Sequence, residues 1–142
     1  MSNILEVKFS AKSENESLSR VIVASFAAKL DPTLDELSDI KMAVSEAVTN
    51  SIVHGYEEDE SKIVYLRCEL EDRMIKVVIE DRGKGIEDIK QAMQPMYTSK
   101  PELDRAGMGF SFMESFMDTL EVVSIKGEGT KVVMTKTIEL PK

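Results

Sequence analysis

Residues 46–50 read Glu-Ala-Val-Thr-Asn, and they lie within a helical pattern that begins at Thr33. The run Thr33-Leu34-Asp35-Glu36 is a capping-box signature and predicts the first turn of that helix. The apolar stripe that follows has helical spacing and comprises Leu37, Ile40, Val44, Ala47 and Val48, with Ser51 at its edge. Gly55 is expected to end the helix. Glu46 and Asn50 are four residues apart, so they share a helix face that differs from the apolar stripe.

A second helix is predicted ahead of this one, over residues 13–30. The run Ser13-Glu14-Asn15-Glu16 resembles another capping box, with Ser13 as the cap and Glu16 reaching back to it. Asp31-Pro32 breaks the helix. The expected buried stripe comprises Leu18, Val21, Ile22, Phe26 and Leu30.

The remaining segments alternate mainly as strands. An opening strand is predicted over residues 4–10, and a hairpin joins strands 63–70 and 74–80 through Glu71-Asp72-Arg73. A helix over 109–117 precedes a last hairpin, with strands 120–125 and 130–138. Residues 81–105 are predicted to form a short helix near 86–93 and then a mobile loop. This order predicts an α+β sandwich in which antiparallel strands carry helices on one face.

Length, composition and charge narrow the possible functions. The 142 residues, 42% of them apolar and 31% charged, fit one domain over residues 1–142. The net charge of −8 and the lack of a basic stripe argue against direct nucleic-acid binding. The apolar runs are too short to span a membrane, and no secretory leader opens the chain. The one cysteine, Cys68, lies in an alternating pattern and is predicted to be a core residue, so we expect a cytoplasmic protein.

The face shared by Glu46 and Asn50 carries the first candidate chemistry. Asn50 offers an oxygen to Mg²⁺, which favours few protein ligands together with phosphates and water. Glu46 is then placed to take a proton from an attacking hydroxyl or water. The alternative is a solvated polar stripe, which is common on helices. The only histidine, His54, is more typical of a helix end than of a nucleophile.

The run Asp81-Arg82-Gly83-Lys84-Gly85 follows a predicted strand directly. Its simplest interpretation is a turn. The functional interpretation makes Asp81 a buried carboxylate that accepts a hydrogen bond from the adenine amino group. Gly83 and Gly85 would then let the backbone approach the base closely. Thr130 is either an ordinary strand threonine or a hydroxyl placed beside Asp81.

The run Gly107-Met108-Gly109 stands just before a predicted helix. It is either a flexible linker with a helix cap or a phosphate site built from the free N–H groups at the helix start. Lys100 and Arg105 lie upstream and either could reach a γ-phosphate, with Arg105 the better candidate. Residues 95–105 are predicted to form a lid that orders over the phosphates. Together, the three motifs supply the parts of a Mg-ATP site.

This set of motifs resembles the GHKL ATPase/kinase superfamily. Its N box matches residues 46–50, its D-x-G-x-G box matches 81–85, its glycine box matches 107–109, and its late threonine matches Thr130. Beyond the motifs, the chain is similar to bacterial anti-sigma factors with serine-kinase activity, above all those of sporulation. Residues 45–56 (SEAVTNSIVHGY) and 98–110 (TSKPELDRAGMGF) carry this likeness. The glycine box has two glycines where several relatives have three.

The resemblance implies a Bergerat-type fold with a mixed, mostly antiparallel sheet. It also implies ATP and Mg²⁺ as cofactors. It further implies that the protein is a homodimer with two protein partners. It would sequester one, a sigma factor, and phosphorylate a serine of the other, a small anti-anti-sigma protein. Arg20, beside Leu18 and Val21, suits an anchor for one of these partners. Three rivals stay open: a detached histidine-kinase ATP-binding domain, a binding module that uses ATP only as a structural ligand, and a hydrolase that drives a clamp.

Overall fold

The computed structural model describes residues 2–86 and 109–140. Its strands are β1 (Asn3–Ser10), β2 (Ile63–Glu71), β3 (Met74–Asp81), β4 (Thr119–Ile125) and β5 (Gly129–Thr137). Its helices are α1 (Ser13–Ala27), α2 (Leu34–Asn50) and α4 (Gly109–Phe116). A 3₁₀ turn, Ala28–Leu30, continues α1, and a π-helical turn, Ser51–Gly55, continues α2.

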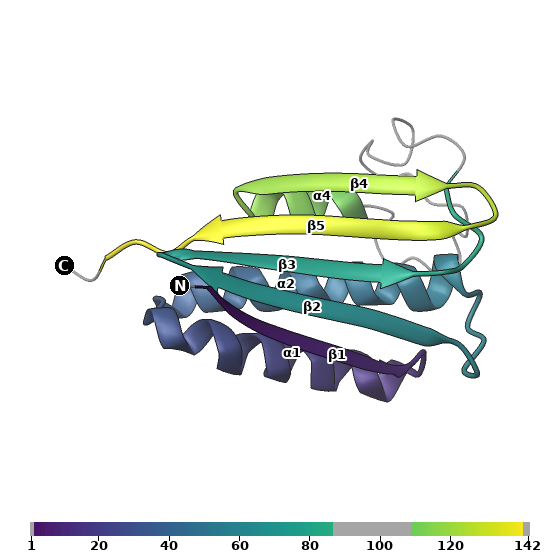
Figure 1. Cartoon of the computed structure of the whole chain (residues 1–142), viewed down its shortest axis with the longest axis horizontal. Coiled ribbons are helices and arrows are strands. Elements are labelled where there is room, and N and C mark those ends of the chain that lie inside the picture. Colours follow the sequence, from purple (N-terminus) through teal and green to yellow (C-terminus); the bar gives the residue numbers. More distant parts are fainter. Residues whose placement is uncertain (1, 87–108, 141–142) are drawn as a thin grey trace.

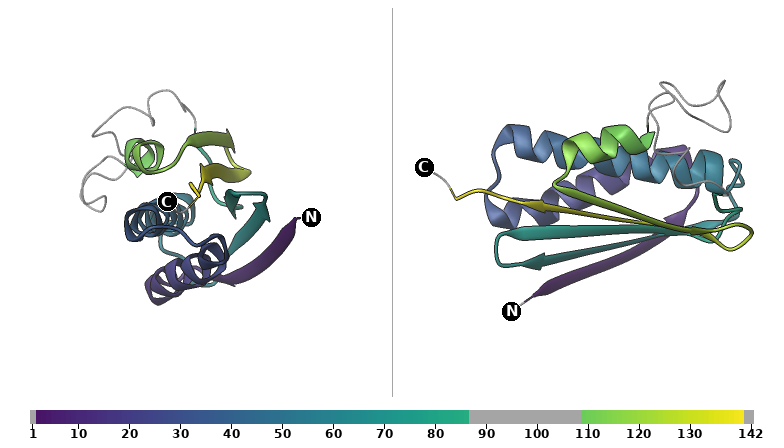
Figure 2. Two further views of the ribbon diagram at one scale, coloured as in Figure 1. Left: turned by 90° about the vertical axis from the view of Figure 1, so that its left-hand side faces the viewer. Right: turned by 90° about the horizontal axis from the view of Figure 1, so that it is seen from above.

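The strands form one sheet in the order β1-β2-β3-β5-β4, and every neighbouring pair in it is antiparallel (Figure 1). The three helices lie on the same face of this sheet, as both views in Figure 2 show. The predicted α+β sandwich with helices on one face is therefore confirmed. Within the described residues, no helix is both long and apolar enough to cross a membrane.

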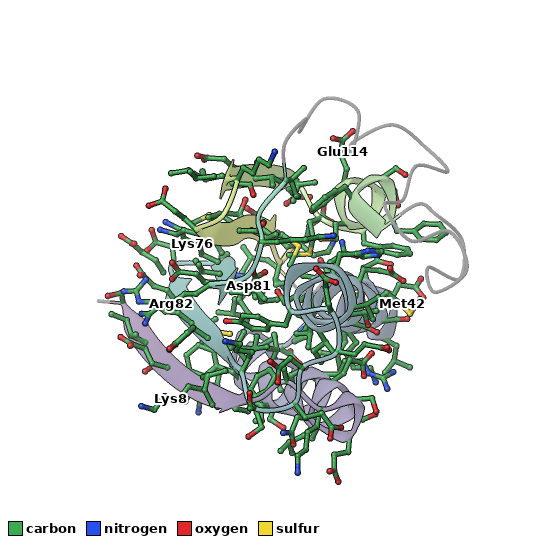
Figure 3. The ribbon with its side chains drawn as sticks, turned by 90° about the vertical axis from the view of Figure 1, so that its right-hand side faces the viewer. Lys8, Met42, Lys76, Asp81, Arg82 and Glu114 are labelled. Atoms are coloured by element: carbon green, nitrogen blue, oxygen red, sulfur yellow. The ribbon has the colours of Figure 1, made fainter. Side chains whose placement is uncertain are left out.

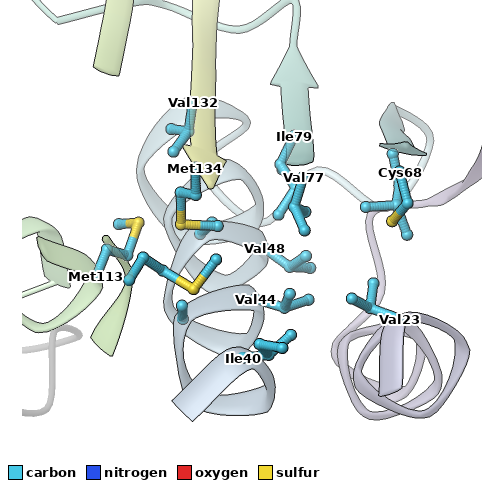
Figure 4. Packing of buried hydrophobic residues seen from close by; sticks show 14 of the residues in the cluster. Val23, Ile40, Val44, Val48, Cys68, Val77, Ile79, Met113, Val132 and Met134 are labelled. Carbon is cyan, nitrogen blue, oxygen red and sulfur yellow. The ribbon is translucent and has the colours of Figure 1, made fainter. Parts of the chain in front are cut away.

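The core fills the space between the sheet and the helices. In β2 and β3, alternate side chains are buried, which is the period expected of strands with one covered face. Ile40, Val44 and Val48 of α2 lie in a row against this layer (Figure 4). Cys68 is fully buried, and burial raises the pKa of its thiol to about 12. It is therefore a neutral core residue, as predicted.

The second predicted capping box is present at the start of α2. The Thr33 hydroxyl accepts from the Glu36 N–H at 3.1 Å, and the Thr33 N–H donates to Glu36 Oε1 at 2.9 Å. These two bonds satisfy backbone donors that the first turn would otherwise leave unpaired. The predicted stripe of α2 is also confirmed, since Ile40, Val44 and Val48 have no exposed surface.

The prediction for the first helix was wrong in two respects. Lys12 is the N-cap and no side chain caps this end, while Glu16 accepts instead from the Ser45 hydroxyl on α2. The predicted stripe is right at Phe26 and Leu30, which are buried, but its first half is rotated: Ser19 and Val23 are fully buried, whereas Leu18 and Val21 are 52% and 61% exposed. The reason is that α1 packs against α2, where Glu16 accepts from Ser45, and this packing sets which face of α1 is covered.

Arg73 holds together the end of the molecule where β3 begins. Its Nη2 donates to the Leu30 carbonyl at 2.7 Å and to the Glu139 carbonyl at 3.0 Å, and its Nε donates to the Ile138 carbonyl at 3.1 Å. One guanidinium therefore joins the 3₁₀ turn after α1 to the segment that follows β5. The planar fork of donors in arginine suits this arrangement better than a lysine would.

Replacing Arg73 by alanine is expected to lower the free energy of unfolding by about 2 kcal/mol, since it removes charge-assisted hydrogen bonds to three carbonyls. Arg67 is the matched control because its ion pairs with Glu6 and Glu69 are on the open face of the sheet. Arg67→Ala should cost less than about 1 kcal/mol. Urea unfolding of both variants makes the comparison, and equal losses would contradict a special role for Arg73.

Candidate nucleotide-binding site

Asp81, the last residue of β3, lies between the sheet and the end of α2 (Figure 3). Its side chain is 3% exposed. Burial raises the pKa of the Asp81 carboxyl, while hydrogen bonds from the Gly83 N–H, the Ser51 hydroxyl and the Thr130 N–H act in the opposite direction. A carboxylate can accept about four hydrogen bonds. The Asp81 carboxyl, which accepts from the Gly83 N–H at 2.9 Å, therefore has further acceptor capacity that fits a ligand amino group.

Glycines allow three backbone segments to meet around Asp81. A Cβ on Gly55 would lie 2.7 Å from Asp81 Oδ1, and a Cβ on Gly83 would lie 2.0 Å from the Gly55 carbonyl oxygen. The Lys84 N–H donates to that same carbonyl at 3.0 Å. Gly129 is equally confined, because its Cβ would lie 2.1 Å from the Asp81 carbonyl oxygen. The π-helical turn, the loop after β3 and the start of β5 are thus in direct contact.

Asn50 and Gly109 bring the first and third motifs together. Asn50 ends α2 and Gly109 begins α4. A Cβ on Gly109 would lie 2.8 Å from Asn50 Nδ2 and 3.1 Å from Asn50 Oδ1. The start of α4 therefore lies beside the Asn50 amide. Glu46, one turn earlier on α2, is partly buried, and so is His54 in the π-helical turn.

Thr130 lies between Asp81, which the sequence predicted as a site residue, and Ser124, which it did not. The β3–β5 register sets it opposite Asp81, and the β4–β5 register sets it opposite Ser124. Its hydroxyl is 2.8 Å from that of Ser124. The sequence did not predict the contacts of Ser124 with Thr130 and of Ser51 with Asp81, because a serine in a strand or at a helix end carries no distinctive pattern. Gly55 was read only as the end of a helix.

Part of the predicted site lies outside the described residues. This holds for Lys100, Arg105 and Gly107, for the predicted lid over 95–105 and for nearly all of the predicted helix over 86–93. Gly85, which is described, has a φ of +75°, and its Cβ would lie 2.2 Å from the Ile125 carbonyl oxygen. Residues 2–86 and 109–140 hold no cluster of three or more His, Cys, Asp or Glu side chains suited to a metal.

Arg20 lies on α1, on a different helix from the candidate nucleotide residues. Its Nε is 3.2 Å from Glu16 Oε2, and its Nη2 donates to the Ser17 hydroxyl at 3.3 Å. The side chain is 38% exposed. Because Leu18 and Val21 are exposed, Arg20 has apolar neighbours at the surface rather than a buried stripe beside it.

Comparison with known proteins defines the class. Residues 9–136 match the family model described as a histidine kinase-like ATPase domain. A crystal structure of the RsbU and RsbW domains of a Mycobacterium tuberculosis protein has the same fold, with a TM-score of 0.71 at 18% identity. That match covers 98% of this chain and 33% of the other. The fold and the family model together identify a histidine kinase-like ATPase domain of the GHKL type.

Two curated relatives narrow the class further. The anti-sigma F factor of Clostridium acetobutylicum is 56% identical over 140 residues, which covers 99% of this chain and 97% of the relative. The anti-sigma F factor of Clostridium perfringens strain SM101 is 57% identical over 136 residues, covering 96% and 97%. The chain therefore belongs to the anti-sigma F factors of the GHKL superfamily, and the resemblance seen in the sequence is confirmed.

Proposed function

We propose that this chain is an ATP-dependent protein serine kinase as well as an anti-sigma factor. It would bind and inhibit a sporulation sigma factor of the sigma-F type and phosphorylate a serine of an anti-anti-sigma partner. We further propose that it works as a cytoplasmic homodimer. The proposal of ATP binding rests on one observation. Asn50 at the end of α2 lies against Gly109, and Gly55 in the π-helical turn that follows α2 lies against Asp81. The names of the relatives support the sigma-factor part.

Each residue would have a distinct task in this reaction. Asp81 would accept from the adenine amino group with a carboxylate oxygen. Asn50 would give an oxygen to Mg²⁺, and the N–H groups at the start of α4 would hold phosphate oxygens. Bound Mg-ATP supplies the transferable phosphoryl group. Glu46 would take the proton of the acceptor serine as its oxygen attacks, and Arg105 or Lys100 would stabilise the γ-phosphate charge.

A transfer assay separates this function from its rivals. The purified chain is mixed with γ-labelled ATP and Mg²⁺, with and without a candidate anti-anti-sigma protein. Acid-stable label on a serine of that protein is the expected result. A histidine-kinase domain would instead label a histidine, a clamp ATPase would release phosphate without an acceptor, and a non-catalytic module would bind ATP and do neither. Any of these three outcomes would refute the proposed kinase.

Asn50→Ala is expected to remove the magnesium dependence of ATP binding, since it deletes the proposed protein ligand of the metal. ATP titrations with Mg²⁺ and with EDTA should give nearly the same affinity in the variant and different affinities in the wild type. Asn15→Ala is a suitable control, because that amide donates to the Ser10 carbonyl at the end of β1, which is separated from β3 and Asp81 by β2. Binding by Asn50→Ala that still responds to magnesium as the wild type does would remove Asn50 from this role.

Arg20→Glu is expected to weaken binding of the sigma factor, the anti-anti-sigma protein or both, and to leave ATP affinity unchanged. The reason is that Arg20 is partly exposed beside two exposed apolar side chains and lies on α1, apart from Asp81 and Asn50. Lys29→Glu reverses an exposed charge in the turn after α1 and is the control. Pull-downs with both partners test this prediction. Unaltered binding of both would show that Arg20 has no role in partner binding.

A further inference from the structure

Ser124 belongs to a polar row that crosses three strands. Ser124 of β4 lies opposite Thr130 of β5, and Thr130 lies opposite Asp81 of β3. Residues directly opposite one another in an antiparallel sheet share a face, so all three side chains are on the helix-covered face. Asp81 and Thr130 belong to the proposed nucleotide site, whereas Ser124 has no role in it so far.

The Ser124 hydroxyl makes three contacts at once. It accepts from the Ile86 N–H at 2.7 Å and donates to the Gly129 carbonyl at 3.0 Å, and it lies 2.8 Å from the Thr130 hydroxyl. A hydroxyl has one proton and two lone pairs. The Ile86 N–H takes one lone pair, and the Gly129 carbonyl takes the only proton. All three contacts are therefore hydrogen bonds only if Thr130 donates its proton to Ser124.

This assignment fixes what Thr130 offers to a ligand. With its proton committed to Ser124, the Thr130 hydroxyl presents only lone pairs. The Asp81 carboxyl, whose Oδ1 already accepts from the Gly83 N–H, also offers acceptor oxygens. Two adjacent acceptors match a donor such as the exocyclic amino group of adenine. They oppose the carbonyl oxygen that guanine carries at the same place, because lone pairs would then face lone pairs.

We propose that Ser124 is a positioning residue for base selection: by holding the proton of Thr130, it makes the site prefer adenine over guanine nucleotides. This inference rests on the proposed ATP-binding function. Ser124 itself need not touch the nucleotide. Without the Ser124 hydroxyl, Thr130 could rotate its proton toward the ligand and accommodate a carbonyl oxygen.

The test compares ATP and GTP affinities in Ser124→Ala and Ser124→Thr. Ser124→Ala should lower the preference for ATP over GTP by roughly three- to tenfold, the equivalent of about one hydrogen bond. Ser124→Thr keeps the hydroxyl and should keep the preference. Thr135→Val is the matched control, because it breaks a similar hydroxyl pair (Thr119 and Thr135, 2.5 Å) at the other end of the same two strands. It should leave the preference unchanged.

A double variant distinguishes positioning from a merely structural effect. Thr130→Val removes the hydroxyl that Ser124 orients, so adding Ser124→Ala should cause no further loss of preference. A thermal melt checks folding, and if Ser124→Ala does not fold, Ser124→Cys carries the same expectation. An unchanged ATP preference in the folded variant, or a further loss in the double variant, overturns this inference alone. A wild type that binds no ATP overturns both the inference and the proposed function.

Discussion

Replacing Glu46 by glutamine is expected to slow phosphoryl transfer to the acceptor serine by roughly 10²–10⁴-fold, the usual cost of losing a general base. The loss should fall toward the lower end, since phosphoryl transfer depends mainly on positioning and electrostatic stabilisation. ATP affinity should stay close to that of the wild type, because glutamine keeps the shape of Glu46 and much of its hydrogen bonding. Single-turnover transfer from labelled ATP measures the rate without interference from product release.

The acidic side chain of Glu114 provides a control for Glu46. It lies on α4, the helix that begins with Gly109, and it is exposed. Glu114→Gln changes the net charge by the same amount and should leave the transfer rate within a few-fold of the wild type. A Glu46→Gln rate within that same range would show that Glu46 is not the base.

Gly83→Ala is expected to weaken ATP binding by roughly five- to 150-fold, corresponding to the 1–3 kcal/mol that overpacking usually costs. The added Cβ would lie 2.0 Å from the Gly55 carbonyl oxygen and 2.9 Å from the Gly55 Cα. Both are main-chain atoms, so neither can move aside by rotating a side chain. The π-helical turn would have to separate from the loop after β3, and this would disturb the donors that hold Asp81.

A glycine in open space controls for the loss of backbone freedom. Gly127, in the β4–β5 turn, has a φ of +83° and no atom within 4 Å of where its Cβ would be. Gly127→Asn should be nearly neutral, since asparagine tolerates positive φ. Isothermal titration with ATP, together with a thermal melt of each variant, separates lost binding from lost stability. ATP binding by Gly83→Ala equal to that of Gly127→Asn would mean that the contact with Gly55 is not critical.

The sequence predicted those features that depend on local pattern. The Thr33 cap and the α2 stripe follow from residues within a few positions of each other, and both are present. The face of α1 could not be predicted in this way, because Val21, Ile22 and Val23 are consecutive apolar residues and the helical period alone does not choose between them. Packing against α2 makes the choice. Glu16 illustrates the same point, since its partner Ser45 is 29 residues away.

The same limit applies to the candidate site: residues in local motifs were predicted, and residues brought in by tertiary contacts were not. Asp81 and Asn50 stand in motifs whose spacing suggests nucleotide chemistry. Ser51 and Ser124 became visible only through strand register and the folding of the π-helical turn against β3, which bring residues from separate elements to one carboxylate or one hydroxyl. Single serines have no periodicity that could have indicated this.

One continuous helical segment carries Glu46, Asn50, Ser51 and Gly55, and this has a geometric consequence. The segment from 46 to 55 has ten residues and nine steps between its ends, or roughly 13 Å at about 1.5 Å per step. The helix therefore fixes the separation between the part of the proposed site that would face the base and the part that would face the phosphates. Each inserted or deleted residue would turn one part by about 100° relative to the other. The helix itself thus sets the relative orientation of the two parts of the proposed site.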